Sequence, residues 1–461
     1  MAVDLNEKIS QDIRYLDSIS KKLAERTGYN LEQLYFADFN IQLNNFNPRI
    51  VKEYWKKLIK DIKNKKKQEL LNFYVHIPFC KNKCTYCNYY SKALTSEKEA
   101  DIYVDYLIQN MQFFYKVFSG VSFKNLYIGG GTPSVLTCDQ IKKLFSYLFR
   151  YFNFEKADTK TLEFNPQTMS LEKLRLIKKF GYNGISFGIQ SFNQKILSAV
   201  KRGYQTYDSI KKIMEYSKKL KFEYVNVDLI IGLKGQDTKS FLETFYKTLE
   251  LCPLAITIYQ LEPTKKYLSK FYNGRANRFY EERKKLILEV LRYIRPIAKK
   301  FNYESSSLST TSHAWIFSVK RDSHSTTNNL YSKIAGYSDF THEPYSIFAL
   351  GPSSRSHIYG YLSYTNFAKK YKFNPQELIF RGNKLSLKDE MIKYILCQII
   401  KYSKISKRLF KENFNSELIK NFNYAITALK KLKKIKIKED IIYFLPTEKK
   451  ERFIYSMFFL V

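Results

Sequence analysis

The chain has 461 residues, 44% hydrophobic and 26% charged, a balance typical of globular proteins and enough for two or three domains. It has no run of about 18 apolar residues and no signal-peptide core, so we expect a cytoplasmic protein without a membrane span. The formal net charge is +35. Because the lysines are spread along the whole chain, a compositional bias is favoured over a nucleic-acid surface.

Residues 1–70 are predicted to form an N-terminal helical extension, since residues 51–70 contain neither Gly nor Pro. Residues 71–270 then alternate between short apolar runs and helical patterns. The runs that favour strands lie at 73–77, 125–129, 160–164, 184–188, 224–230 and 255–259. One of the helical patterns opens with Thr137 and Gln140 in capping-box spacing. Six alternations of strand and helix predict an α/β fold with a parallel sheet or barrel.

The second half of the chain divides into two further regions. Residues 271–385 are less regular and rich in hydroxyl side chains, as in SSSLSTTSH and GPSSRSHIYG, so we expect a loop-rich region that covers a substrate. Residues 386–461 are helical up to a predicted hairpin at 434–445 with a charged turn. Helices followed by a hairpin favour a small winged-helix-like domain.

Three of the six cysteines lie within one short segment, CKNKCTYC, as Cys80, Cys84 and Cys87. An odd number of cysteines disfavours a closed disulfide framework, and three is one ligand short of a structural zinc site. Three thiolates would hold three corners of a 4Fe–4S cluster and leave one iron open for chemistry. The few cysteines outside the segment are consistent with a reducing compartment.

The other unusual residues follow the predicted strands and therefore lie on the same rim as the cysteine segment. GGGTPS (129–134) follows the second strand, Glu163 ends the third, Gln190 follows the fourth, and Asp228 lies near the end of the fifth. In α/β barrels this rim carries the active site. Taken alone, the glycines have a simpler interpretation as a turn, and each polar residue as a solvated or hydrogen-bonded strand end.

CKNKCTYC and GGGTPS together resemble the radical SAM superfamily. More narrowly, YVHIPFC, LYIGGGTPS, SFGIQSFN and NVDLIIGLKGQ are similar to the family of oxygen-independent coproporphyrinogen III oxidase, which includes the heme chaperone HemW and anaerobic heme-opening methyltransferases. The resemblance covers about residues 70–265 closely. It implies a partial (βα)6 radical SAM barrel over 71–270, with the N-terminal helical extension and the C-terminal winged-helix-like domain attached to it.

By this resemblance, Cys80, Cys84 and Cys87 bind a 4Fe–4S cluster whose open iron takes the amino and carboxylate groups of S-adenosylmethionine. One-electron reduction then cleaves the sulfonium and starts radical chemistry. The residues implied to hold S-adenosylmethionine are Tyr74, Gly130, Gly131, Thr132, Glu163, Gln190, Arg202 and Asp228. Glu163 is implied to accept from the ribose hydroxyls, and Arg202 to pair with the methionine carboxylate or a neighbouring acid.

The function implied is that of a radical S-adenosylmethionine enzyme acting on a tetrapyrrole, porphyrin or heme. Two alternatives remain open: an anaerobic heme-degrading methyltransferase, and a heme-binding chaperone with little turnover. An RNA-modifying radical enzyme is a third reading, but the sequence shows no separate RNA-binding motif, and nucleic acid is not an expected partner. The expected partners are the tetrapyrrole and an electron donor such as flavodoxin or ferredoxin.

The chain departs from the family pattern in three places. The oxidases carry a further Cys two residues past the third ligand, where this chain has Asn88 and then Tyr89. The HNxxY motif of the chaperone has only NNLYS (328–332) as its nearest match. The family's GPGAHSY reads GPSSRSH, which places Arg355 and His357 at unusual positions. We expect both residues to contact the substrate, Arg355 through a propionate.

Four of the five histidines fall in the region after the predicted barrel, at positions 313, 324, 342 and 357. A lone histidine is usually a surface or core residue, but one of these would suit a heme iron. Trp315 fits either a stacking role on a macrocycle or burial in a core.

Overall fold

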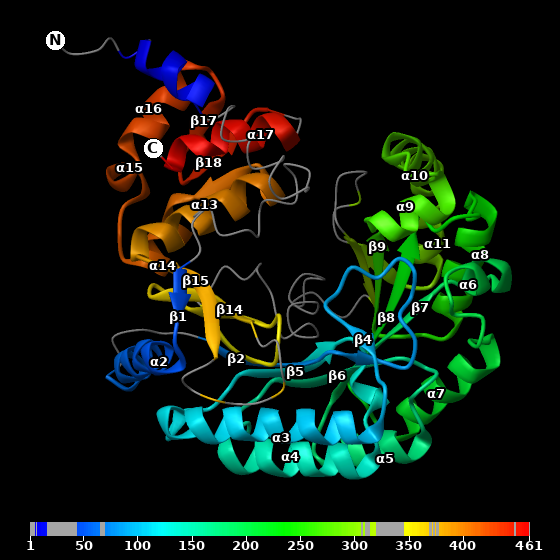
Figure 1. Ribbon diagram of the computed structural model, residues 1–461. Helices are drawn as coiled ribbons and strands as arrows, with labels where there is room; N and C mark the ends of the chain where they lie inside the picture. The colour runs from blue at the N-terminus through cyan, green and yellow to red at the C-terminus, as the bar shows by residue number, and fades with distance from the viewer. Residues whose placement is uncertain are drawn as a thin grey trace.

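The computed structural model describes residues 5, 7–15, 44–64, 70–305, 308, 314–319, 345–367, 371, 374, 378–446 and 449–460. A large mixed sheet forms its centre, with helices wrapped around one face and a smaller C-terminal unit above the other (Figure 1). None of the helices in the described residues is both long and apolar enough to cross a membrane.

The main sheet has 13 strands. In spatial order they are β1 (Asn44–Phe46), β15 (Ile379–Lys384), β14 (Leu362–Phe367), β13 (Arg355–Ile358), β12 (Tyr345–Leu350), β2 (Leu70–Ile77), β5 (Asn125–Gly130), β6 (Thr159–Phe164), β7 (Gly184–Gln190), β8 (Tyr224–Ile231), β9 (Ala255–Gln260), β11 (Ala314–Val319) and β10 (Tyr303–Ser305). Pairing is parallel from β12 to β9 and antiparallel at both edges.

Helices connect the parallel strands and continue beyond them. They are α2 (Pro48–Lys63), α3 (Glu97–Phe114), α4 (Cys138–Tyr151), α5 (Leu171–Lys179), α6 (Gln194–Ala199), α7 (Tyr207–Lys219), α8 (Thr238–Glu250), α9 (Lys265–Tyr272), α10 (Ala276–Leu291) and α11 (Ile294–Lys300). The predicted capping box is present, with the Thr137 side chain accepting from Gln140 N and the Gln140 side chain from Thr137 N.

All six predicted strands are confirmed, as β2, β5, β6, β7, β8 and β9. The predicted hairpin is also confirmed, as β17 (Ile435–Lys438) and β18 (Ile441–Phe444). These segments were predictable because strand–helix alternation and β-branched runs are local signals.

Two expectations about regularity are wrong. The N-terminal region is not wholly helical, because β1 lies within it and pairs with β15. The region after residue 270 is not mostly loop: it holds α10, α11 and six strands, β10 to β15. GPSSRSHIYG contains β13, since Ser356 is buried and donates to Ala349 O while accepting from Ala349 N at 3.0 Å. The hydroxyl-rich stretches 306–307, 309–313 and 320–344 lie outside the described residues.

The parallel strands alternate between an apolar and a polar face. Phe73, Ile128, Leu162, Phe187 and Val227 are buried in the core shared with the helices. The other face, called the inner face here, carries Asn72, Tyr74, His76, Tyr127, Thr161, Glu163, Ser186, Asn226, Asp228 and Thr257. Parallel strands buried on both faces are usually apolar throughout, so the polar inner face indicates a surface built for a polar ligand.

The C-terminal unit combines helices with a second sheet of order β16–β18–β17. Its elements besides the hairpin are α13 (Leu387–Tyr402), β16 (Lys404–Ser406), α14 (Lys407–Phe414), α15 (Leu418–Asn421), α16 (Asn423–Lys431) and α17 (Lys449–Ser456). It has its own apolar core, which includes Ile395, Phe410, Leu429 and Ile442. Helices followed by a hairpin in a three-stranded sheet give it a winged-helix-like arrangement.

Helix α2 attaches to the antiparallel edge of the main sheet through one buried indole. The Trp55 ring packs edge-on against Phe348 with centroids 5.5 Å apart. Its Nε1 donates to Tyr364 Oη at 2.9 Å, and both side chains are fully buried. A buried N–H without a partner costs free energy, so this hydrogen bond contributes to holding α2 on the sheet.

Replacing Tyr364 with Phe should lower the free energy of unfolding by about 1–3 kcal/mol, because the indole N–H stays buried without an acceptor. Urea denaturation measures the change. Tyr443→Phe is the control, since Tyr443 lies exposed on β18 and should change stability by less than about 0.5 kcal/mol. Equal effects of the two changes would contradict this account of α2 docking.

Candidate functional site

The cysteine segment follows β2 and is closed into a compact loop by backbone hydrogen bonds. Cys80 ends the short strand β3 (Phe79–Cys80), which pairs with β4 (Lys92–Ala93). Leu94 N donates to Cys80 O at 2.9 Å, and Cys87 N donates to Cys84 O at 3.3 Å. All three thiols are free and partly buried. The loop therefore presents three sulfur ligands from one short stretch of chain.

The glycine segment after β5 packs directly against this loop. Gly131 N donates to Ile77 O at 2.8 Å. A Cβ at position 131 would lie 2.7 Å from Phe79 O and 3.0 Å from Cys80 Sγ, so no side chain fits there. Gly130 has φ of 116°, a region open mainly to glycine. Thr132 Oγ1 lies 3.4 Å from Cys80 Sγ. Because its glycines have no side chains, the GGGT segment lets its backbone pack directly against Cys80, the first cysteine of the loop.

The donor set fits an iron–sulfur cluster. Among the described residues, no three His, Cys, Asp or Glu side chains converge closely enough to hold a single metal ion. A cubane binds each thiolate through a different iron, so its ligands stand farther apart than those of one ion. Burial raises the pKa of the Cys80 and Cys87 thiols, and a bound cation would compensate the thiolate charge.

Arg202 places a buried positive charge beside the cysteine loop. Its Nη1 lies 3.9 Å from Cys84 Sγ and 3.4 Å from the Tyr86 hydroxyl. Its Nη2 donates to Gly188 O at 2.5 Å. The side chain is 5% exposed and its Nε has no hydrogen-bond partner. A guanidinium stays charged in proteins, so Arg202 offers its charge and a free donor to an anion next to the loop.

Two partly buried carboxylates lie on the inner face. Tyr127 Oη donates to Glu163 Oε1 at 2.5 Å, and Gly130 N donates to Oε2 at 3.1 Å. Asp228 Oδ1 accepts from Asn226 Nδ2 at 2.8 Å. Burial, followed by the charge of Glu163, raises the pKa of Asp228 to about 7. Burial also raises the pKa of Glu163, against the hydrogen bonds from Tyr127 and Gly130. Such a pair favours a ligand that donates hydrogen bonds or carries positive charge.

Gln190 sits at an irregular end of β7. The pairing with β8 shifts between Gly188 and Gln190, and Gln190 has φ of 68°, rare for a residue with a side chain. Its Oε1 is buried without a partner. The free acceptor of Gln190 and the free donor of Arg202 fit a zwitterionic amino-acid group such as that of S-adenosylmethionine.

Tyr74 lies beside this site on the next strand. Its ring stacks on Tyr127 at 6.2 Å, and its hydroxyl lies 3.1 Å from His76 Nδ1. His76 Nε2 in turn lies 2.9 Å from Tyr90 O. Tyr127 and His76 were not predicted as site residues from the sequence. Their signal is the period of two along NFYVHI and NLYIGG, which places Asn72, Tyr74, His76 and Tyr127 on one face.

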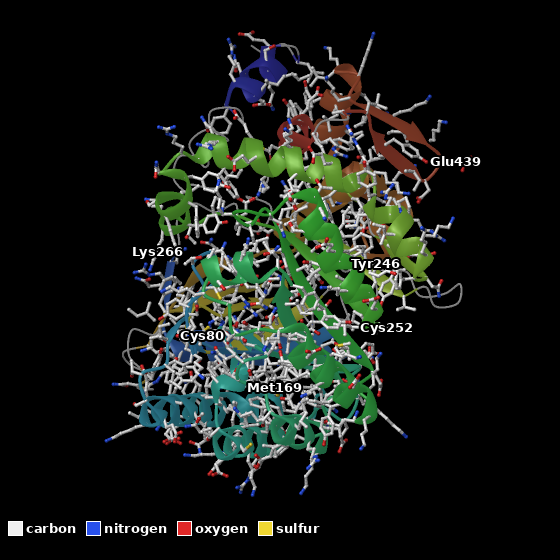
Figure 2. The ribbon with its side chains drawn as sticks, turned by 90° about the vertical axis from the view of Figure 1, so that its right-hand side faces the viewer. Cys80, Met169, Tyr246, Cys252, Lys266 and Glu439 are labelled. Atoms are coloured by element: carbon white, nitrogen blue, oxygen red, sulfur yellow. The ribbon has the colours of Figure 1, made fainter. Side chains whose placement is uncertain are left out.

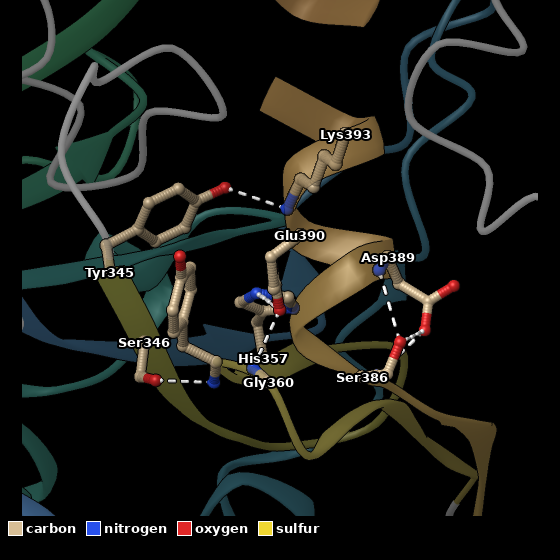
Figure 3. A network of polar contacts seen from close by, with 9 residues as sticks. Tyr345, Ser346, His357, Gly360, Ser386, Asp389, Glu390 and Lys393 are labelled. Carbon is tan, nitrogen blue, oxygen red and sulfur yellow. Dashed lines mark hydrogen bonds and ion pairs between the residues drawn. The ribbon is translucent and has the colours of Figure 1, made fainter. Parts of the chain in front are cut away.

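The structure therefore brings together the cysteine loop and all the residues expected around S-adenosylmethionine. Arg355 and His357 lie farther along the same face, on β13. His357 is buried, with Nε2 3.0 Å from Glu390 Oε1 of α13, an ion pair when the imidazole is protonated (Figure 3). Glu390 Oε1 also accepts from Gly360 N at 2.8 Å. His357 thus contacts the C-terminal unit, a partner that the sequence analysis did not foresee.

The other candidates of the second half divide into two groups. Trp315 is fully buried in the main core and pairs with Ile258, so the core interpretation is confirmed and stacking on a macrocycle is wrong. The histidines at 313, 324 and 342, and the NNLYS segment, lie outside the described residues.

The three remaining cysteines belong to other elements of the fold. Cys138 begins α4, Cys397 lies in α13, and Cys252 is exposed after α8. Figure 2 shows Cys80 and Cys252 at well-separated parts of the molecule. These cysteines serve as natural controls for the three in the loop.

The chain is similar to known proteins over its central part. Residues 74–246 match the radical SAM superfamily. The chain is 31% identical over 243 residues to the heme chaperone HemW of Buchnera aphidicola subsp. Schizaphis graminum, covering 51% of this chain and 62% of that protein. It is 32% identical over 189 residues to the oxygen-independent coproporphyrinogen III oxidase of Escherichia coli, covering 41% of each. The matches thus span about half the length of these relatives.

The fold agrees over a much longer stretch. The solved structure of coproporphyrinogen III oxidase (HemN) from Escherichia coli, a radical SAM enzyme, superposes with a TM-score of 0.71 over 90% of this chain and 93% of that one, at 20% identity. This likeness shows a shared fold over most of both chains. Residues 74–246 thus match the radical SAM superfamily, whose members use a 4Fe–4S cluster and S-adenosylmethionine.

Proposed function

We propose that the protein is a radical S-adenosylmethionine enzyme that acts on a tetrapyrrole. The observation that carries the proposal is the joint geometry of the loop and the inner face: three cysteines, a side-chain-free backbone against Cys80, and the buried Arg202 and partly buried Glu163 around them. The cluster and S-adenosylmethionine, when bound, supply reductive carbon–sulfur cleavage and hence radical chemistry.

The residues of this chain divide the work of holding the cofactor. Cys80, Cys84 and Cys87 hold the cluster. Arg202 binds the methionine carboxylate through its free donor, and Gln190 accepts from the ammonium. The backbone of Gly130–Thr132 also approaches the ammonium group of S-adenosylmethionine. Glu163 and Asp228 accept from ribose hydroxyls, which relieves the mutual repulsion of the two carboxylates. Tyr74 and Tyr127 form an aromatic wall beside them.

The tetrapyrrole substrate is supported by similarity to both HemW and the coproporphyrinogen oxidases. The position after the third ligand disfavours the oxidase reaction itself, because Asn88 and Tyr89 supply no thiol, and Tyr89 is 60% exposed. Besides a modified oxidase, two candidate functions therefore remain. One is an anaerobic methyltransferase that opens heme, and the other is a heme chaperone with little turnover. The similarity to HemW favours the second of these.

The exterior of the loop suits an acidic electron donor such as flavodoxin or ferredoxin. Lys81, Lys83, Tyr89 and Tyr90 are exposed around the cysteines. The next helix on this side, α9, touches the loop through Thr264 Oγ1, which donates to Thr85 O at 3.2 Å. Positive side chains around a redox centre attract a negatively charged partner.

Replacing Cys80, Cys84 or Cys87 with Ala should each abolish cluster assembly and cleavage of S-adenosylmethionine, because each thiolate binds a separate iron. Iron and sulfide content, the visible absorbance of the cluster, and cleavage products under reduction measure this. Cys138→Ala, Cys252→Ala and Cys397→Ala should match the unmodified protein. A reconstituted protein that takes up zinc and no iron would refute the proposal.

The raised pKa of Asp228 predicts a pH dependence of stability. The folded protein keeps this proton above the usual value of 3.8, with a pKa of about 7. The contribution of Asp228 to folding is therefore present at low pH and is lost as the pH rises from about 4 to about 7. Asp228→Asn keeps the acceptor for Asn226 but cannot ionise. Its free energy of unfolding, relative to that of the unmodified protein, should therefore be about 2–3 kcal/mol higher at about pH 8 than at about pH 5.

Urea denaturation of cluster-free protein at the two pH values gives this difference. Asp208→Asn is the control, because Asp208 is exposed on α7, and its effect should be the same at both pH values. If the stability advantage of Asp228→Asn did not change with pH, the pKa of Asp228 would not be raised in the folded protein.

A further inference from the structure

Arg355, Thr365 and Arg381 form one row across three neighbouring strands. Thr365 of β14 is the register partner of Arg355 on β13 and of Arg381 on β15. Residues paired directly across strands project from the same face of a sheet. The two arginines therefore flank Thr365 on one face, about 10 Å apart, twice the spacing between strands. Both arginines are exposed.

This row lies on the inner face, in continuation of the cofactor residues. Tyr74 pairs with Ala349. Ile347, two residues before Ala349 on β12, pairs with His357. Because alternate residues of a strand share a face, Arg355 projects on the same side as Tyr74. The two residues are two strands apart, so the row begins about 10 Å from the edge of the cofactor site.

Apolar side chains complete the surface. Phe367 and Ile379 are register partners on β14 and β15. They are 46% and 43% exposed, unusual for large apolar residues on a sheet. Phe367 and Thr365 are alternate residues of β14 and share a face. The Arg381 guanidinium lies 4.8 Å from the Phe367 ring centroid, so a cation and an aromatic ring are presented together.

We propose that Arg355, Thr365, Phe367, Ile379 and Arg381 form a binding site for a flat apolar ring system bearing at least two carboxylates. The ring lies on Phe367 and Ile379, and the carboxylates bind the two guanidinium groups. A planar fork of donors suits a carboxylate better than a point charge does. The inference rests on the proposed function and deepens it, since propionate-bearing tetrapyrroles have this chemistry.

The test is titration of the full-length protein with coproporphyrin III, which carries four propionates, followed by porphyrin fluorescence. Arg355→Gln and Arg381→Gln should each raise Kd about 10- to 100-fold, the scale of a lost hydrogen bond to a charged group. Arg381→Lys should recover part of the loss. Lys384→Gln is the matched control, because Lys384 is an exposed cation on the same strand but on the other face.

The tetramethyl ester of coproporphyrin III, held in mild detergent, separates ring binding from carboxylate binding. Its Kd should be the same for the unmodified protein and both Gln variants. Unchanged coproporphyrin affinity in Arg381→Gln, with retained cluster content and S-adenosylmethionine cleavage, would overturn the site and leave the proposed function standing. Absence of porphyrin binding by an unmodified protein that still cleaves S-adenosylmethionine would overturn both the site and the tetrapyrrole substrate.

Discussion

The close contact between the glycine backbone and the cysteine strand is the constraint on which the site depends. Gly131 lies so near Phe79 and Cys80 that a single methyl group would overlap them. This contact holds the carboxyl ends of β2 and β5 together, and it also orients the cysteine loop that follows β2. Gly130, whose N–H donates to Glu163 Oε2, extends the same contact to the Glu163 carboxylate. The positions of the thiols and of Glu163 are thus set by one stretch of backbone.

Charge balance is the second determinant. Two partly buried carboxylates lie on the inner face, and the buried guanidinium of Arg202 lies beside the cysteine loop. Arg202 is in reach of Cys84 but has no carboxylate among its hydrogen-bond partners. Buried charges without full compensation destabilise a fold unless a ligand completes them. A sulfonium-bearing zwitterion between Arg202 and the carboxylates, next to an anionic cluster, would supply the missing charges. The arrangement of charges therefore favours binding of S-adenosylmethionine and the cluster, at some cost to the stability of the protein without them.

Features of this structure that depend on residues close together in the sequence could be predicted, whereas features that depend on contacts between distant segments could not. The parallel strands β2, β5, β6, β7, β8 and β9 and the Thr137–Gln140 cap depend on neighbours within a few residues, and they were predicted correctly. Strand β13 was not, because its Ser356 gains a buried backbone partner only when β12 lies beside it. His357 was expected to meet substrate, yet its partner Glu390 comes from a helix that no local pattern connects to it. Tyr127 was missed because its role exists only opposite Glu163.

The most direct test of the account is anaerobic incubation of the reconstituted protein with reductant, S-adenosylmethionine, and either heme or coproporphyrinogen III, with every product identified by mass. The account predicts 5′-deoxyadenosine or S-adenosylhomocysteine in amounts that depend on the tetrapyrrole, together with a tetrapyrrole of altered mass. Tight heme binding with neither product and no altered tetrapyrrole would contradict the enzymatic function and leave the chaperone in its place.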